Sequence, residues 1–166
     1  MNLTNPLPEE FTSYRLNKTL HGRSVHRPAN VRGHNVFKGY KHPGTGDGGD
    51  LFCEAGTPVK AMHSGQIGYI NRDRDNAPKG QDYGPKSVLY LEGVQQTIDV
   101  TTVYAHIHIK DDLKAGKSVT AGQVIGYVGR LIRDPHLHLE VWIDGKAISG
   151  KRPAAWAESV ASRVTA

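Results

Sequence analysis

Apolar and polar residues alternate most regularly between positions 136 and 143 of this chain, which has 166 residues. Successive side chains of a β-strand point to opposite faces, so the alternation predicts a strand with two unlike faces. One face would carry the apolar residues Leu137, Leu139, Val141 and Ile143. The other would carry His136, His138, Glu140 and Trp142. We therefore expect two imidazole rings side by side above an apolar floor.

Short runs of β-forming residues, separated by glycine-rich turns, occupy the rest of the middle of the chain. These runs cover 51–53, 58–62, 65–70, 87–91, 101–107 and 113–129. Many short strands joined by tight turns are typical of all-β domains. We expect one mainly antiparallel β-sheet domain over residues 41–150, with a groove walled by loops around His42, 72–85 and 107–113. Loops as long as 72–85 are often functional.

The two ends of the chain lack this pattern. Residues 1–40 are rich in Pro, Asn, Arg and His and show little periodicity, which indicates an irregular arm packed on the domain. In residues 151–166, Trp156, Val160 and Val164 recur at helical spacing. This spacing predicts an amphipathic C-terminal helix that packs outside the sheet.

Composition narrows the range of partners. The formal net charge of +5 favours an anionic partner, such as an acidic cell wall, a membrane surface or nucleic acid. The basic residues are scattered, without a long run or an interleaved aromatic series, so we expect no nucleic-acid partner. The single cysteine, Cys53, excludes an intramolecular disulfide and a cysteine-rich zinc cluster. A metal site in this chain would therefore use histidines and carboxylates.

Four segments, in this order, resemble the lysostaphin-type zinc metallopeptidases, which cut peptidoglycan cross-links. They are Asp50 with Gly-Thr-Pro-Val-Lys-Ala at 56–61 and Gly-Gln-Ile at 65–67, Val-Tyr-Ala-His at 103–106, Val-Thr-Ala-Gly-Gln-Val-Ile-Gly at 119–126, and Pro-His-Leu-His-Leu-Glu-Val at 135–141. The resemblance extends over about residues 42–148. It implies the β-fold of that family and zinc-dependent hydrolysis of peptide bonds in peptidoglycan stem peptides or cross-bridges.

The resemblance also implies roles for individual residues. That family holds one Zn²⁺ per chain with a His, an Asp four residues later and the second His of His-x-His, which makes Asp50 and His138 two of the ligands. Three protein ligands and one open position are the pattern of catalytic zinc. His106 and His136 take the places of the two remaining family histidines, which would orient or deprotonate the attacking water and stabilise the oxyanion.

One ligand is missing from its usual place, because Gly46 stands four residues before Asp50. The nearest candidate is His42, displaced by a glycine-rich insertion that could loop out. His34 is the second candidate, and Asp47 is a poorer third because it changes the ligand type. We take His42 with Asp50 and His138 as the metal ligands. A catalytically degenerate binding or activator module on the same fold is the alternative.

Further expectations concern the remaining histidines and the setting of the protein. His63 and His108 fall beside strands, and we expect both on the surface. The first residues lack the pattern of a signal peptide, and no stretch is long and apolar enough for stable membrane insertion. We therefore expect a monomer made in the cytoplasm that acts on the bacterial cell wall, as a phage-released endolysin or a virion-associated lysin would.

Overall fold

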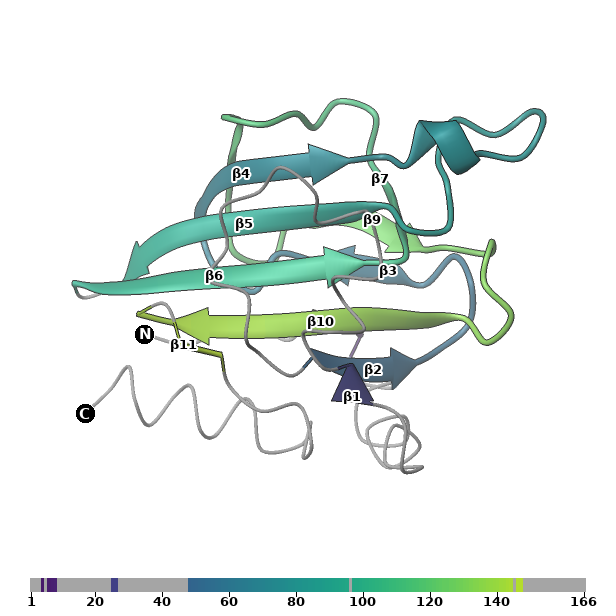
Figure 1. Cartoon of the computed structure of the whole chain (residues 1–166). Helices are drawn as coiled ribbons and strands as arrows, with labels where there is room; N and C mark the ends of the chain where they lie inside the picture. Colours follow the sequence, from purple (N-terminus) through teal and green to yellow (C-terminus); the bar gives the residue numbers. More distant parts are fainter. Residues whose placement is uncertain are drawn as a thin grey trace.

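The computed structural model describes residues 4, 6–8, 25–26, 48–95, 97–144 and 146–147 (Figure 1). Its strands are β1 Val25–His26, β2 Gly48–Phe52, β3 Pro58–Lys60, β4 Gly65–Asn71, β5 Val88–Gln95, β6 Ile98–Ala105, β7 Ile107–Ile109, β8 Ser118–Val119, β9 Val124–Val128, β10 His136–Ile143 and β11 Lys146–Ala147. A short 3₁₀ helix, η2 Arg74–Asn76, follows β4. Among the described residues no helix is long and apolar enough to cross a membrane.

The strands form two antiparallel sheets. The large sheet has the order β1-β2-β10-β6-β5-β4-β8, with β11 beside β10, and the small sheet has the order β3-β9-β7. Every strand pair in both sheets is antiparallel. The mainly antiparallel β-fold expected from the sequence is therefore confirmed.

The main core lies on one face of the large sheet, where the alternation of β10 predicted it. Leu137, Leu139 and Val141 are fully buried there. The same cluster includes Val59, Ile107, Ile109, Ile125 and Val128 from the small sheet and the segments beside it. Its burial stabilises the packing of the two sheets by the hydrophobic effect. The opposite face of the large sheet carries a second, smaller cluster of Val88, Tyr90, Val103, Ala105 and Trp142.

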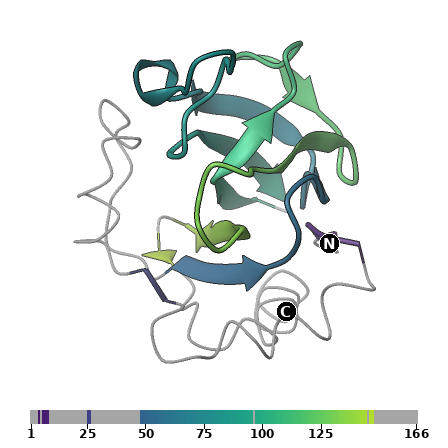
Figure 2. The same ribbon diagram turned by 90° about the vertical axis from the view of Figure 1, so that its right-hand side faces the viewer.

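A single residue separates the two sheets along the chain after β6. Ile98–Ala105 belongs to the large sheet and Ile107–Ile109 to the small one, so the chain passes from one sheet to the other at His106. His106 has a φ of +63°, in the left-handed region. Figure 2 shows the end of the large sheet toward which β2 and β6 run and from which β10 starts.

Short parts of the predicted N-terminal arm contact the domain. The Thr4 amide donates to the Met62 carbonyl at 2.7 Å, and the Lys60 amide donates to the Pro6 carbonyl at 2.8 Å. Leu7 belongs to the main core, and β1 pairs with β2. The rest of residues 1–40 and the helix expected over 151–166 lie outside the described residues.

The expectation that His63 lies on the surface is wrong, because its side chain is 1% exposed. The His63 Nδ1 lies 3.0 Å from the Ser64 carbonyl, which can only accept, so this nitrogen carries the proton. The Nε2 lies 3.0 Å from the Thr102 hydroxyl and accepts from it in the neutral ring. That hydroxyl also contacts the hydroxyl of Tyr104 at 2.9 Å. These bonds explain how a histidine is tolerated inside a sheet core.

Burial governs the ionisation of both ends of this network. It lowers the pKa of His63, although the hydrogen bond to Ser64 opposes the shift. It also raises the pKa of Tyr104 to about 12. Both side chains are therefore neutral at pH 7.

We expect His63 to make the fold sensitive to acid. Below a pH of about 6.5 the unfolded chain binds a proton at His63, whereas His63 in the folded chain stays neutral. The free energy of unfolding therefore decreases as the pH falls, until the pH reaches the lowered pKa of His63 in the folded state. The slope from this residue is at most about 1.4 kcal/mol per pH unit. The free energy of unfolding in urea at pH 7.5 and 5.0 should therefore fall more for the wild type than for His63→Gln.

The matched control is His108→Gln, since the His108 side chain is 41% exposed. This control should keep most of the pH dependence of the wild type. Equal pH dependence in the wild type and His63→Gln would contradict the prediction.

Candidate active site

The register of β10 brings Asp50 and His138 together. In the ladder of β10 with β2, His138 stands opposite Asp50, and in the ladder with β6 it stands opposite Ala105. Residues directly opposite in an antiparallel pair have Cα atoms about 4.5–5.5 Å apart. Two positions far apart in the sequence are therefore neighbours in the backbone of the sheet, with β10 between β2 and β6 (Figure 1).

Three histidine rings form a cluster at this end of the sheet. The ring centroids of His106 and His136 are 4.9 Å apart, with an angle of 69° between the planes. The centroids of His106 and His138 are 6.1 Å apart. His138 is 2% exposed and His106 is 8% exposed, while His136 is half-buried. The structure thus brings together the three predicted histidines of the motifs, from β10 and from the junction after β6.

Backbone carbonyls orient two of the three rings. The Nδ1 of His106 lies 2.8 Å from the carbonyl oxygen of Pro85, and the Nδ1 of His136 lies 2.7 Å from that of Asp134. Because a carbonyl only accepts, each Nδ1 donates a proton to its partner. In the neutral rings the basic lone pair is then on Nε2, and this nitrogen is the one suited to proton transfer.

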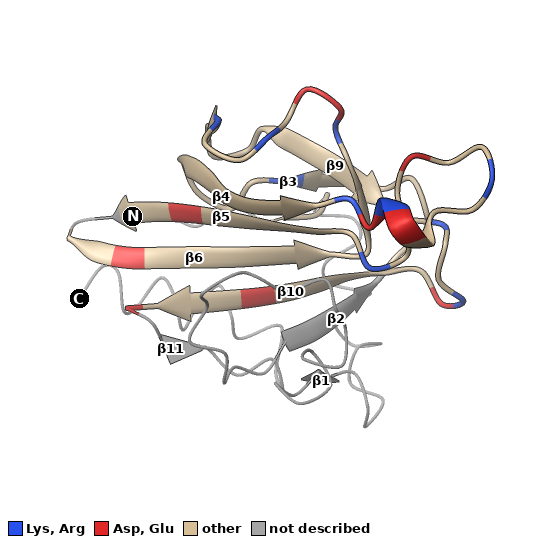
Figure 3. Ribbon diagram, turned by 45° about the horizontal axis from the view of Figure 1, so that its top comes forward, with Lys and Arg blue, Asp and Glu red and all other residues tan. Residues whose placement is uncertain are grey.

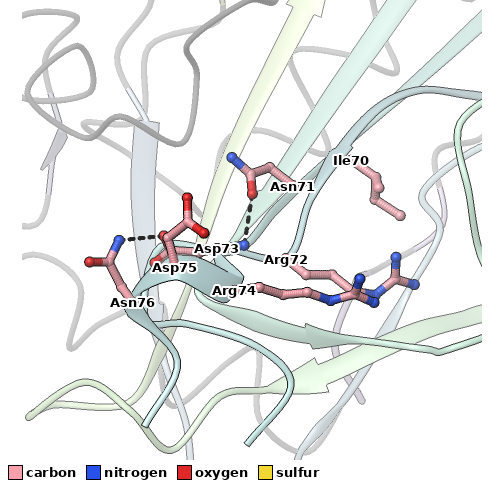
Figure 4. A pocket seen from close by; sticks show the side chains of 7 residues that line it. All are labelled: Ile70, Asn71, Arg72, Asp73, Arg74, Asp75 and Asn76. Atoms are coloured by element: carbon pink, nitrogen blue, oxygen red, sulfur yellow. Dashed lines mark hydrogen bonds between the residues drawn. The ribbon is translucent and has the colours of Figure 1, made fainter.

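The long loop 72–85 is closed at its base by Asp73. Its carboxylate accepts hydrogen bonds from the Lys86 amide at 2.9 Å and from the Asn76 side chain at 2.7 Å. The Asp73 amide donates to the Asn71 side chain at 2.7 Å (Figure 4). A Cβ on Gly84 would lie 2.1 Å from the Asp73 carbonyl oxygen, so only glycine fits there. This closure places the Pro85 carbonyl, the partner of His106.

A pocket of about 690 Å³ opens beside this loop, lined by Ile70, Asn71, Arg72, Asp73, Arg74, Asp75 and Asn76 (Figure 4). Asn71 lies in one row across the sheet with Val88, Ala105 and His138. Three strand spacings separate Asn71 from His138, which is about 14 Å. Figure 3 shows charged residues of both signs gathered around η2, while the strands carry few.

Loops 72–85 and 107–113, both expected to wall the groove, contact each other. The guanidinium of Arg72 donates to the carbonyl oxygens of Lys110 and Leu113, at 2.8 Å in both cases. These two bonds tie the loop that holds His106 to the segment that follows β7. The third loop, around His42, lies outside the described residues.

Glu140 is a member of the site to which the sequence analysis assigned no role. Its Oε2 lies 3.9 Å from the Nε2 of His138, and the two side chains are 3% and 2% exposed. A carboxylate beside the second ring nitrogen is the usual companion of a metal-binding histidine. The alternation of β10 already placed the two residues on one face, and only the structure shows their separation.

A different group of potential ligands lies on the surface. Among the described side chains, the ligand atoms of Asp82, His108 and Asp111 are within 4.8 Å of one another. The His108 Nε2 is 3.6 Å from Asp82 and 4.0 Å from Asp111. Both carboxylates are exposed, and the His108 ring stacks on Tyr83 at 4.3 Å. Exposed acidic groups of this kind are common without an ion.

The predicted ligands can be placed only in part. His42 and its alternatives His34 and Asp47 lie outside the described residues, and Asp50 is described by its backbone. His138 is described in full and is buried next to Glu140. The assignment of His42, Asp50 and His138 to a metal therefore stays a prediction.

Comparison with known proteins identifies the family. The sequence profile of peptidase family M23 matches residues 44–149, more than half of the chain. The chain belongs to peptidase family M23. The resemblance to lysostaphin-type peptidases expected from the sequence is thereby confirmed.

Individual relatives of the M23 domain share part of its sequence. It is 32% identical over 102 residues to the DD-carboxypeptidase/endopeptidase Mpg of Neisseria meningitidis serogroup B, a match that covers 60% of this chain and 20% of the relative. The match thus spans about a fifth of the length of that relative. The same values hold for the protein of that name in Neisseria gonorrhoeae.

Solved structures resemble the M23 domain as well. The catalytic domain of lysostaphin from Staphylococcus simulans is 27% identical, with a TM-score of 0.49, over 69% of this chain and 80% of that one. Helicobacter pylori Csd3 is 19% identical, with a TM-score of 0.50, over 97% of this chain and 39% of that one. At this identity the likeness to Csd3 concerns the fold alone.

The left-handed conformation of His106 yields a prediction about stability. A residue with a Cβ is disfavoured in this region, whereas glycine adopts it readily. We expect His106→Gly to be more stable than His106→Ala by about 1 kcal/mol. Urea unfolding of the two variants, followed by circular dichroism, measures the difference.

His136 provides the matched control, since it lies in β10 with an ordinary strand backbone. In the middle of a strand, glycine lowers the free energy of unfolding relative to alanine by roughly 0.5–1 kcal/mol. His136→Gly should therefore be the less stable member of its pair. The same order at both positions would show that the conformation of His106 has no bearing on stability.

Proposed function

We propose that the M23 domain is a zinc-dependent endopeptidase that hydrolyses peptide bonds in peptidoglycan stem peptides or cross-bridges. The observation that carries this proposal is the convergence of His106, His136 and His138 at one end of the sheet, with Asp50 opposite His138 in the ladder. A merely structural sheet has no need for two histidine rings with centroids within 6.1 Å of that of His106.

The chemistry of the donors fits zinc. In this proposal His42, Asp50 and His138 hold the ion, and imidazole and carboxylate are both ligands that zinc accepts. The buried Glu140, 3.9 Å from His138, supports the assignment because it can fix the orientation of a ligating ring. When bound, zinc supplies a Lewis acid that polarises the scissile carbonyl and acidifies an attacking water molecule.

His106 and His136 handle protons in the proposed reaction. With the Nδ1 proton of each ring directed to a backbone carbonyl, the Nε2 lone pair is the basic position. One ring takes the proton of the attacking water at its Nε2 and passes it to the leaving amine, and the other, protonated at Nε2 by solvent before the attack, donates a hydrogen bond to the oxyanion. The separation of 4.9 Å between their centroids lets both reach one small reacting group.

Peptidoglycan is the proposed substrate because of the relatives and the charge. The Neisseria relatives are named DD-carboxypeptidase/endopeptidase, and the formal net charge of +5 favours association with anionic cell envelopes. The phage-released or virion-associated setting expected from the sequence stays a prediction. The degenerate binding module also stays open, because Gly46 stands where the family has its first ligand.

The test combines zinc analysis with a zymogram on purified peptidoglycan. We expect about one zinc per chain in the wild type, loss of lysis with a chelator and recovery on zinc addition. His138→Ala should lose both zinc and activity. His106→Ala should keep its zinc and lose activity by roughly 10²–10⁴-fold, the range for removal of a general acid or base.

The control is His108→Ala, which removes the histidine of the surface group with Asp82 and Asp111. It should keep both zinc and activity. A wild-type protein without zinc after supplementation would refute the proposal, and zinc without lysis would favour the binding module. Parallel analysis of His42→Ala and His34→Ala decides which histidine is the first ligand.

A further inference from the structure

We propose that Ser87 is a positioning residue for His106, so that a buried hydroxyl outside the histidine cluster controls the rate of the reaction. The inference rests on the proton-transfer role proposed for His106. Ser87 directly precedes β5 and is fully buried. It belongs to none of the motifs that resemble the peptidase family.

Ser87 makes hydrogen bonds to the main chain of both His106 and Ile107. Its carbonyl oxygen accepts a hydrogen bond from the His106 amide at 2.9 Å. Its hydroxyl donates to the carbonyl oxygen of Ile107, the next residue. The first bond continues the ladder of the large sheet, and the second holds Ile107, the first residue of β7 in the small sheet. One residue therefore spans the junction at which the chain changes sheets.

The junction needs this support because His106 adopts a left-handed backbone conformation, with a φ of +63°. A residue with a side chain stays in this region only where its surroundings over-determine it. Two other contacts act together with Ser87. The Gly129 amide donates to the His106 carbonyl at 2.8 Å, and the ring itself donates to Pro85 at 2.8 Å.

Of the hydrogen bonds that hold His106 and Ile107, the one from the Ser87 hydroxyl is the bond that a single side-chain substitution removes without removing the others. In Ser87→Ala the main-chain bond from the His106 amide can persist, while the bond to the Ile107 carbonyl is lost. The peptide unit between Ile107 and His108, whose carbonyl the hydroxyl holds, then has more freedom to rotate. Through the backbone of Ile107 this motion reaches His106, and its imidazole shifts relative to His136. Displacements of about 1 Å in a catalytic group can cost on the order of 100-fold in rate.

The experiment compares Ser87→Ala with Thr102→Val in the full chain. Thr102 is equally buried and hydrogen-bonded, but its partners are His63 and Tyr104 in the core. Soluble muropeptides from digested peptidoglycan serve as substrate. We expect kcat to fall about 10- to 100-fold in Ser87→Ala, with KM within threefold and zinc content unchanged. Thr102→Val should keep kcat within threefold despite its lower stability.

A spectroscopic measurement tests the effect of Ser87 on the His106 ring independently of activity. Nitrogen-15 NMR of the histidine rings should show His106 with its proton on Nδ1 in the wild type and in Thr102→Val. In Ser87→Ala the signals should broaden or move toward a mixture of the two tautomers. If Ser87→Ala does not fold, Ser87→Cys replaces it, because a thiol is a weaker donor of similar shape, and the same direction of change is expected.

The outcomes separate this inference from the proposed function. Wild-type kcat and an unchanged His106 tautomer in Ser87→Ala would overturn the role of Ser87 while leaving the peptidase intact. Equal losses of kcat in Ser87→Ala and Thr102→Val would also overturn it, since stability would then explain both. A wild-type protein without zinc or lysis would refute the proposed function, and the inference with it, whatever the NMR spectra show.

Discussion

The hydrogen-bonded register of β10 between β2 and β6 is the constraint on which the rest of the structure depends. It fixes which residues stand opposite His138, and it turns Leu137, Leu139 and Val141 toward the main core. A shift of one residue would exchange the two faces, placing the histidines in the main core and the leucines on the face of the candidate site. The apolar burial that stabilises the sheet therefore also holds the candidate site in place.

His106 also belongs both to the candidate site and to the junction between the two sheets. The chain leaves the large sheet and enters the small one at this residue, in a conformation that side chains disfavour. The contacts that enforce it come from two segments, one with Pro85 and Ser87 and the other with Gly129. A ring placed at such a junction is held by the packing of two sheets, and rigid placement is what the proposed proton transfer requires.

Polar groups inside the sheet follow two different patterns. His63 and Thr102 satisfy each other in the core, where burial keeps the imidazole neutral. His138 and Glu140 lie on the opposite side of the sheet, equally buried, with an imidazole and a carboxylate 3.9 Å apart. In the core, both ring nitrogens of His63 have hydrogen-bond partners within the fold. The pair of His138 and Glu140 has the composition of a metal-binding imidazole and its supporting carboxylate.

The sequence by itself determined the β-class, the two faces of β10 and the three histidines that lie together in the candidate site, because alternation and motif are local properties of the chain. It could not reveal that His63 is buried or that Glu140 is close to His138. Nor could it reveal that Pro85, Ser87 and Gly129 surround His106. The contacts of His63 and His106 join residues distant along the chain, and only the pairing of the strands and the packing of the two sheets decide which of them meet. Glu140 and His138 are near in sequence, but the distance between their side chains depends on conformations that only the folded sheet fixes.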